Sequence, residues 1–186
     1  PILNVEAKFF GDSIHFWSEV KDHPNNDAWW QARNPLPHLT DVKTAELVVG
    51  GWFDAEDRNG PLATDAANER QKPGASNRLM MGPWSHGQWG YVEGDNLGNV
   101  HWGSNTAERY REAELEFFNY YLKDKGELTL PDAQVFDTGA LKWREFDAWP
   151  PANVEPAARY LQPGGGLAFT PPTGSGSVDE SVSDPD

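Results

Sequence analysis

The chain has 186 residues, enough for one domain with a substantial apolar core. Its 15 basic and 29 acidic side chains give a formal net charge of −14, which argues against nucleic acid and anionic membranes as partners. There is no cysteine, which excludes disulfide bonds and thiol catalysis, and no apolar run approaches the roughly 20 residues of a membrane-spanning helix.

The first 40 residues are rich in polar and aromatic side chains. FFGDSIHFWSEV and NNDAWWQARN predict short helices, and NPLPHL predicts a break, because proline disfavours helix for the residue before it. AELVVGGWF follows, an apolar run of β-forming residues that ends in glycines and an aromatic pair. Such a run is typical of a strand buried on both faces of a parallel sheet.

The next segments alternate helix and strand. GPLATDAANERQ predicts a helix, and SNRLMMGPW predicts a second buried strand. A longer helix then begins at Asn105, an N-cap with Glu108 three residues later, and Gly126 predicts its end. One face of this helix is apolar at helical spacing: Ala107, Tyr110, Ala113, Phe117 and Tyr121. Strand, helix, strand, helix is the order of a parallel α/β sheet.

After Gly126 the pattern changes to short β-like runs separated by glycine and proline turns. We therefore predict an α/β fold with three parts: residues 1–40 as a helical connection, 41–130 as the α/β part, and 131–186 as the start of an all-β unit.

Two side chains that could carry chemistry follow the two buried strands. Asp54 comes directly after the first strand and His86 after the second, so both are expected at the carboxyl edge of the sheet, where open α/β sheets place their sites. A carboxylate that orients a histidine is the pairing that a hydrolase uses for general base catalysis. Each residue alone is better explained as a turn former or, for Asp54, as a helix N-cap, and only the two together favour catalysis.

The remaining acidic residues and the nucleophile are less clear from spacing. Glu56 and Asp57 fit a solvated acidic loop, and a calcium loop is a poor fit because Ala55 and Ala66 would stand at the first and last ligand positions. The zinc motif H-E-x-x-H is absent, so neither a metal nor another cofactor is predicted. No G-x-S-x-G elbow occurs, which leaves a candidate base and its orienting acid without a serine.

Three motifs, GGWFDAED, GPWSHGQWG and LKWREFDAWPP, in this order resemble a family of serine hydrolases. The family includes α-amino acid ester hydrolases and glutaryl-7-aminocephalosporanic acid acylases, with cocaine esterase and the X-Pro dipeptidyl peptidases as more distant relatives. The resemblance implies an α/β-hydrolase domain, a helical cap (a remnant in residues 1–40) and a C-terminal jelly roll that begins in residues 131–186 and continues beyond Asp186.

Carried over by position, Asp54 corresponds to the triad acid and His86 to the triad histidine. Glu56 and Asp57 correspond to carboxylates that hold the α-ammonium group of the substrate, and a carboxylate can orient a primary ammonium by charge-assisted hydrogen bonds. The resemblance also implies that the serine elbow, an oxyanion-hole tyrosine and a further carboxylate lie upstream of Pro1, in the rest of a longer polypeptide.

The expected function is therefore part of a serine esterase or acylase for esters and amides of α-amino acids, including β-lactam side chains. A glutaryl-type acylase or an X-Pro dipeptidyl peptidase with the same triad is the alternative within the family. A non-catalytic carbohydrate-binding module is the alternative outside it. Sugars would stack on the rings of five tryptophans: Trp29, Trp30, Trp84, Trp89 and Trp102. The family resemblance further implies a periplasmic or secreted protein that forms homo-oligomers.

We predict that the 186 residues alone do not hydrolyse esters, because the acylated serine is expected outside them. An assay of the isolated chain with an activated ester and a serine-directed inhibitor tests this expectation. Inhibitor-sensitive turnover would contradict it.

Overall fold

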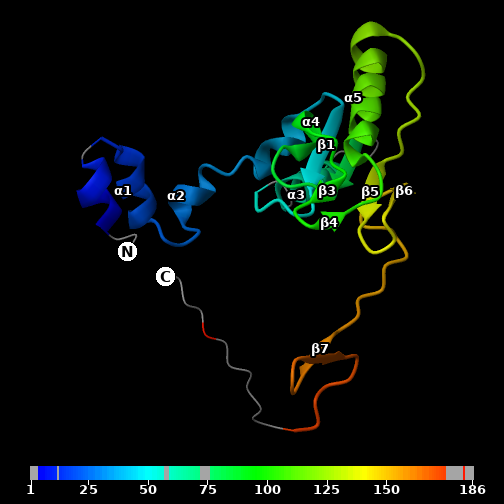
Figure 1. Cartoon of the computed structure of the whole chain (residues 1–186). Coiled ribbons are helices and arrows are strands. Elements are labelled where there is room, and N and C mark those ends of the chain that lie inside the picture. The colour runs from blue at the N-terminus through cyan, green and yellow to red at the C-terminus, as the bar shows by residue number, and fades with distance from the viewer. Residues whose placement is uncertain (1–3, 12, 57–58, 72–75, 175–181, 183–186) are drawn as a thin grey trace. The chain divides into compact units, whose positions relative to one another are not determined.

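The computed structural model describes residues 4–11, 13–56, 59–71, 76–174 and 182 (Figure 1). The chain divides into two compact units, Pro1–Trp149 and Pro150–Asp186. None of the described helices is both long enough and apolar enough to cross a lipid bilayer.

The N-terminal segment of the first unit consists of short helical turns, as predicted. They are η2 (Glu6–Phe10), α1 (His15–Asp22), α2 (Ala28–Gln31) and η3 (Leu36–Asp41). Asp27 caps α2, because its carboxylate accepts from the backbone N–H of Trp29 at 2.9 Å. The predicted break at NPLPHL forms the 3₁₀ helix η3 instead, since a proline in the first helical turn removes no needed hydrogen bond.

The main sheet of this unit has four strands in the order β1-β2-β5-β6. Their bounds are β1 (Glu46–Gly51), β2 (Asn77–Gly82), β5 (Ala133–Asp137) and β6 (Lys142–Phe146). β1 and β2 pair in parallel, and β5 pairs in parallel with β2, while β6 runs antiparallel to β5. The parallel pairing of the two buried strands confirms the prediction, and it brings the carboxyl ends of β1, β2 and β5 to one edge.

Side chains along these strands alternate between two apolar layers. One layer contains Met80 and packs against α5 (Thr106–Lys123) through Ala113 and Phe117. The other contains Leu79, Met81, Ala133 and Val135, packed against Leu62 of α3 (Asn59–Gln71), Trp52, Phe146 and Trp149. A helix therefore covers each face, so both faces bury apolar area, at about 1.5–3 kcal/mol for each fully buried large side chain.

The ends of α5 are set by two polar side chains. At its start, the Asn105 side chain accepts from the backbone N–H of Glu108 at 3.1 Å, as the capping pattern predicts. At its end, the predicted stop at Gly126 is wrong, because the helix ends at Lys123 and Asp124 adopts the left-handed conformation at φ 50°. Aspartate is among the few residues besides glycine that enter this region readily.

Smaller elements complete both units. The first contains α4 (Gln88–Tyr91) and a two-stranded pair, β3 (Asn96–Leu97) with β4 (Val100–His101). The described residues of the second unit include the hairpin of β7 (Tyr160–Gln162) with β8 (Gly166–Ala168), in which the turn residues Gly164 and Gly165 have φ of 75° and 78°.

The structure divides the chain later than the sequence predicts. The change to an all-β unit was expected at residue 131, but β5 pairs with β2 and β6 pairs with β5, so both strands belong to the main sheet, and the compact units divide between Trp149 and Pro150. A short strand beside a turn has the same local pattern in either sheet, and the distant pairing partner decides where it belongs. The cap predicted for residues 1–40 stays a prediction, and so does the jelly roll predicted for residues 131–186, of which residues 150–186 form the second unit.

Gly51 marks a close approach of backbones at the end of β1. A Cβ atom at this position would lie 2.3 Å from the carbonyl oxygen of Trp84, whereas one at Gly60 in α3 meets nothing within 4 Å. We predict that Gly51→Ala lowers the free energy of unfolding by about 1–3 kcal/mol, as overpacking does. Gly60→Ala is the matched control and should cause no loss. Urea unfolding measures both, and equal midpoints for the two variants would contradict the prediction.

Candidate active site

Asp54 lies in a turn that the end of β2 holds in place. After Gly51 the backbone N–H of Trp52 donates to Gly82 O at 2.9 Å, and that of Phe53 donates to Trp84 O at 3.1 Å. The two chain segments thus stay paired beyond the strands. This brings the Asp54 side chain, only 2% exposed, to the carboxyl edge of the sheet.

His86 lies in the corresponding turn after β2, and a buried glutamine holds that turn. The Gln88 side chain accepts from the backbone N–H of Ser85 at 3.0 Å and donates to Asn96 O at 2.9 Å. The Tyr91 hydroxyl donates to the His86 carbonyl at 3.1 Å. The backbone on both sides of His86 is therefore fixed, while its imidazole stays 67% exposed.

The two turns bring Asp54 and His86 into contact. Asp54 Oδ2 lies 3.1 Å from His86 Nδ1, and Asp54 Oδ1 accepts from the backbone N–H of Glu56 at 2.7 Å. A carboxylate placed in this way accepts the Nδ1–H of a neutral imidazole and fixes the tautomer whose Nε2 carries the lone pair. An oriented, exposed imidazole backed by a buried carboxylate is suited to act as a general base.

Glu56 adds a second carboxylate beside the histidine. Its Oε2 lies 3.7 Å from His86 Nδ1, and its side chain is 80% exposed. Because Asp54 is closer and buried, Asp54 orients the ring, and the Glu56 carboxylate is exposed to whatever binds next to it. The site therefore carries negative charge on the solvent side of the imidazole.

Trp84 fills the space beneath both turns. Its ring is fully buried, its Nε1 donates to Thr106 Oγ1 at 2.8 Å, and it packs against Trp89 and Trp143 at ring distances of 5.5 and 5.6 Å. A Cβ at Gly82 would lie 2.3 Å from this ring, so the chain needs glycine there. The Trp84 ring thereby ties the end of β2 to the start of α5.

An aromatic surface borders the pair. Phe53, next to Asp54, is half-exposed and stacks on the buried Trp102 at a ring distance of 5.6 Å. Tyr91, which holds the His86 carbonyl, is itself exposed. An apolar group of a bound molecule could pack on these rings.

The structure brings together three of the four residues singled out in the sequence. Asp54 and His86 are in contact as predicted, and Glu56 lies beside them, whereas Asp57 lies outside the described residues. The sequence reasoning missed Gln88 and Tyr91. Gln88 is the first residue of α4, and its position two residues after the histidine was the one available signal of a turn-holding side chain.

No group of three or more histidine or carboxylate side chains suited to a metal ion occurs within the part of the chain that the structure describes. The contacts of Asp54, His86 and Glu56 are those of an acid–base pair with a neighbouring carboxylate.

The chain is similar to known proteins in sequence and in fold. The family model described as X-Pro dipeptidyl-peptidase (S15 family) matches residues 6–88, a stretch that includes Asp54 and His86. Cocaine esterase from Rhodococcus sp. (strain MB1 Bresler) is 30% identical over 170 residues, which are 89% of this chain and 28% of that protein.

Two solved structures are also similar to this chain in sequence and fold. An aminopeptidase from the marine sediment archaeon Thaumarchaeota archaeon is 31% identical, with a TM-score of 0.78 over 86% of this chain and 26% of that one. An α-amino acid ester hydrolase labelled with selenomethionine is also 31% identical, with a TM-score of 0.78 over 89% of this chain and 28% of that one. The chain thus spans about a quarter of the length of these relatives.

The mixed sheet with a helix on each face is an α/β architecture of the α/β-hydrolase type. The matches in sequence and structure support the superfamily that contains cocaine esterase and the X-Pro dipeptidyl peptidases.

Gln88 is predicted to hold the His86 turn. Gln88→Ala leaves the Ser85 N–H and the Asn96 carbonyl without their partner, so the free energy of unfolding should fall by about 1–3 kcal/mol. The Ser85 amide should exchange with deuterium faster. Gln31→Ala is the control, since Gln31 is exposed and donates to Asn26 O at 3.2 Å, and it should change stability by less than about 0.5 kcal/mol. A similar effect of both substitutions would refute this role of Gln88.

Proposed function

We propose that this chain is part of a serine hydrolase that cleaves esters or amides of α-amino acids, including β-lactam side chains, and that the serine lies outside the chain. The contact between Asp54 Oδ2 and His86 Nδ1, at 3.1 Å, carries the proposal. It supplies two of the three groups of a Ser-His-Asp triad at the sheet edge where α/β-hydrolases place them. The superfamily contains esterases and peptidases, which supports hydrolysis as the reaction.

In the proposed reaction, His86 removes the proton of the serine hydroxyl as the serine attacks the carbonyl carbon. His86 then gives that proton to the leaving alcohol or amine, and an acyl-enzyme forms. A water molecule, deprotonated by His86, then attacks the acyl-enzyme, and His86 gives that proton to the serine oxygen as the acid leaves. Asp54 stays ionised throughout and stabilises the imidazolium, for which its position behind the ring is suited.

Glu56 is the residue that we assign to the choice of substrate. Its exposed carboxylate, 3.7 Å from the histidine, can accept from a primary ammonium group while the neighbouring ester carbonyl faces the serine. We give Asp57 the same role on the basis of its place in the D-A-E-D run. The alternative is a glutaryl-type acylase or an X-Pro dipeptidyl peptidase with the same triad. The assay of Glu56 described below distinguishes this alternative from an enzyme that selects the α-amine.

The carbohydrate-binding alternative has less support. Trp84 is fully buried and Trp102 is 3% exposed, so neither ring can stack on a sugar.

We propose that residues 1–40 belong to a cap and that residues 150–186, with the β7–β8 hairpin, begin a jelly roll.

The first prediction from this proposal concerns Asp54. In the complete protein, Asp54→Asn should lower kcat by about 10⁴-fold, because the amide no longer favours the tautomer with its lone pair on Nε2. Steady-state ester hydrolysis measures the change. Asp132→Asn, which alters an exposed carboxylate paired with Arg78, is the matched control and should leave kcat unchanged. A fall of less than tenfold for Asp54→Asn would contradict the triad assignment.

The second prediction concerns Glu56. In the complete protein, Glu56→Gln should raise KM about tenfold or more for esters with a free α-amine, because it removes a charge-assisted hydrogen bond. The matched des-amino esters should keep their KM, and kcat should change little for either. If Glu56 instead acts on His86, both ester series lose activity together and the pH profile of kcat shifts, an outcome that would reject the ammonium assignment.

A further inference from the structure

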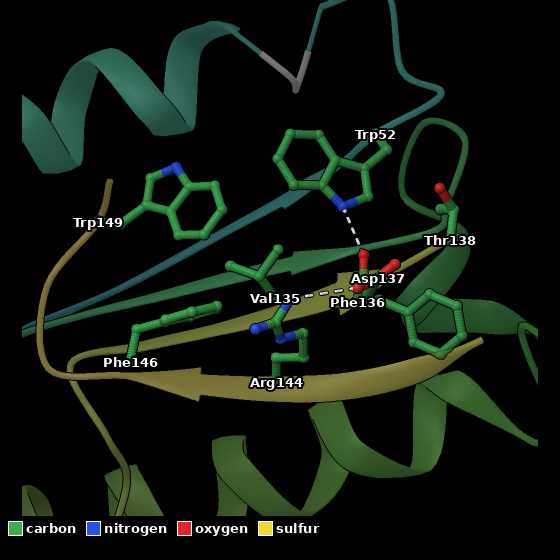
Figure 2. A pocket seen from close by; sticks show the side chains of 8 residues that line it. All are labelled: Trp52, Val135, Phe136, Asp137, Thr138, Arg144, Phe146 and Trp149. Atoms are coloured by element: carbon green, nitrogen blue, oxygen red, sulfur yellow. Dashed lines mark hydrogen bonds and ion pairs between the residues drawn. The ribbon is translucent and has the colours of Figure 1, made fainter. Parts of the chain in front are cut away.

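A cavity of about 260 Å³ opens on the sheet face that carries α3, and neither Asp54, Glu56 nor His86 lines it. We call it the tryptophan cavity, after Trp52 and Trp149 in its wall. Figure 2 shows the two indoles on one side and Phe146 with Arg144 on the other, with Val135 between them. Asp137 and Thr138, which follow β5, close the end at the carboxyl edge of the sheet.

The aromatic walls are fixed by contacts of their own. The Trp52 Nε1 donates to Phe136 O at 3.0 Å, which holds that indole across the end of the sheet (Figure 2). Trp149 packs on Trp52 at a ring distance of 6.2 Å and on Phe146 at 5.3 Å. The cavity therefore has flat apolar walls that need little rearrangement. In a pre-formed site of this kind, little binding free energy is spent on ordering side chains.

The polar groups of the cavity divide into a satisfied acceptor and available donors. The Asp137 carboxylate accepts from the backbone N–H groups of Ala140 at 2.9 Å and Gly139 at 3.0 Å, and lies 3.4 Å from Arg144. These donors, the Ala140 N–H foremost, hold the pKa of Asp137 below its usual value. Asp137 thus stays ionised and already has partners on both oxygens.

The donors have capacity left. The Arg144 contact with Asp137 is longer than the 2.7–2.9 Å of a strong charge-assisted bond, and its planar group, 5.3 Å from the Phe146 ring centre, faces the cavity (Figure 2). Within the described residues, neither the Thr138 hydroxyl nor the Trp149 Nε1 makes a hydrogen bond. A molecule whose acceptors reach the Arg144 guanidinium, the Thr138 hydroxyl and the Trp149 Nε1–H can therefore form hydrogen bonds that these donors do not make within the described residues.

We propose that the tryptophan cavity binds a planar aromatic carboxylate. Its ring lies between the indoles and the Phe146 side, and its carboxylate accepts from the Arg144 guanidinium, which is planar and can bond both oxygens at once. Aromatic rings favour offset or edge contacts with the walls, which the tilted Trp52, Phe146 and Trp149 rings offer. This inference does not depend on the proposed hydrolase activity.

The experiment uses 2-naphthoate as the probe, because its flat bicyclic ring and single carboxylate match the cavity. Titration calorimetry on the complete protein should show saturable binding. Arg144→Gln should weaken it about tenfold or more, as loss of a charged hydrogen-bond partner does. Trp149→Ala should weaken it as well. Arg144→Lys keeps the charge but not the planar guanidinium, so its affinity for 2-naphthoate should lie between those of the native protein and Arg144→Gln.

Two controls make the result specific. Arg159→Gln removes another exposed arginine that lies over an aromatic ring, 3.8 Å from the centre of Phe169 in the second unit, and should leave binding unchanged. The amine 2-naphthylmethylamine, with the same ring and the opposite charge, should bind at least tenfold more weakly than 2-naphthoate. Three results would each overturn the proposal. They are unchanged affinity of folded Arg144→Gln for 2-naphthoate, equal affinity of the native protein for the amine, and no binding of 2-naphthoate at about 1 mM, a concentration at which even weak specific binding is detected.

Discussion

The fully buried ring of Trp84 is the contact on which the rest of the site depends. The backbone carbonyl of Trp84 accepts from the Phe53 N–H, and the ring occupies the space beside Gly82. The indole N–H donates to the Thr106 hydroxyl at the start of α5. The backbone and the side chain of this one residue thus fix the turn of Asp54 and the turn of His86 against each other. Because interiors are packed at nearly crystalline density, a smaller residue here would loosen both turns together.

This wedge also explains why the site requires glycines. A Cβ at Gly82 would lie 2.3 Å from the Trp84 ring, and one at Gly51 would lie 2.3 Å from the Trp84 carbonyl oxygen. The third, Gly94, has φ of 68°, and its carbonyl accepts from the Thr106 hydroxyl, whose oxygen receives the indole N–H. A chain of hydrogen bonds therefore runs from the Trp84 ring to the segment before β3, with each polar group satisfied.

Local pattern predicted much of this arrangement. The two apolar runs that end at Gly51 and Gly82 could be read as neighbouring parallel strands, so the meeting of Asp54 with His86 followed from their positions after those strands. The place of β5 and β6 did not follow, because Gln134 and Arg144 give these strands the polar alternation of any half-exposed sheet. Gln88 was equally hidden: a glutamine is usually exposed, and only the fold surrounds this one with Ser85 and Asn96.

The antiparallel strand β6 has a consequence for how copies of this protein meet one another. It is the last strand on its side of the described sheet, and it presents Lys142, Arg144 and Glu145 with their charges exposed. An outer strand with free backbone groups can recruit a strand from another molecule, and charged side chains oppose that pairing. This edge is therefore protected against growth by strand addition, and copies of the protein are not expected to meet through β6.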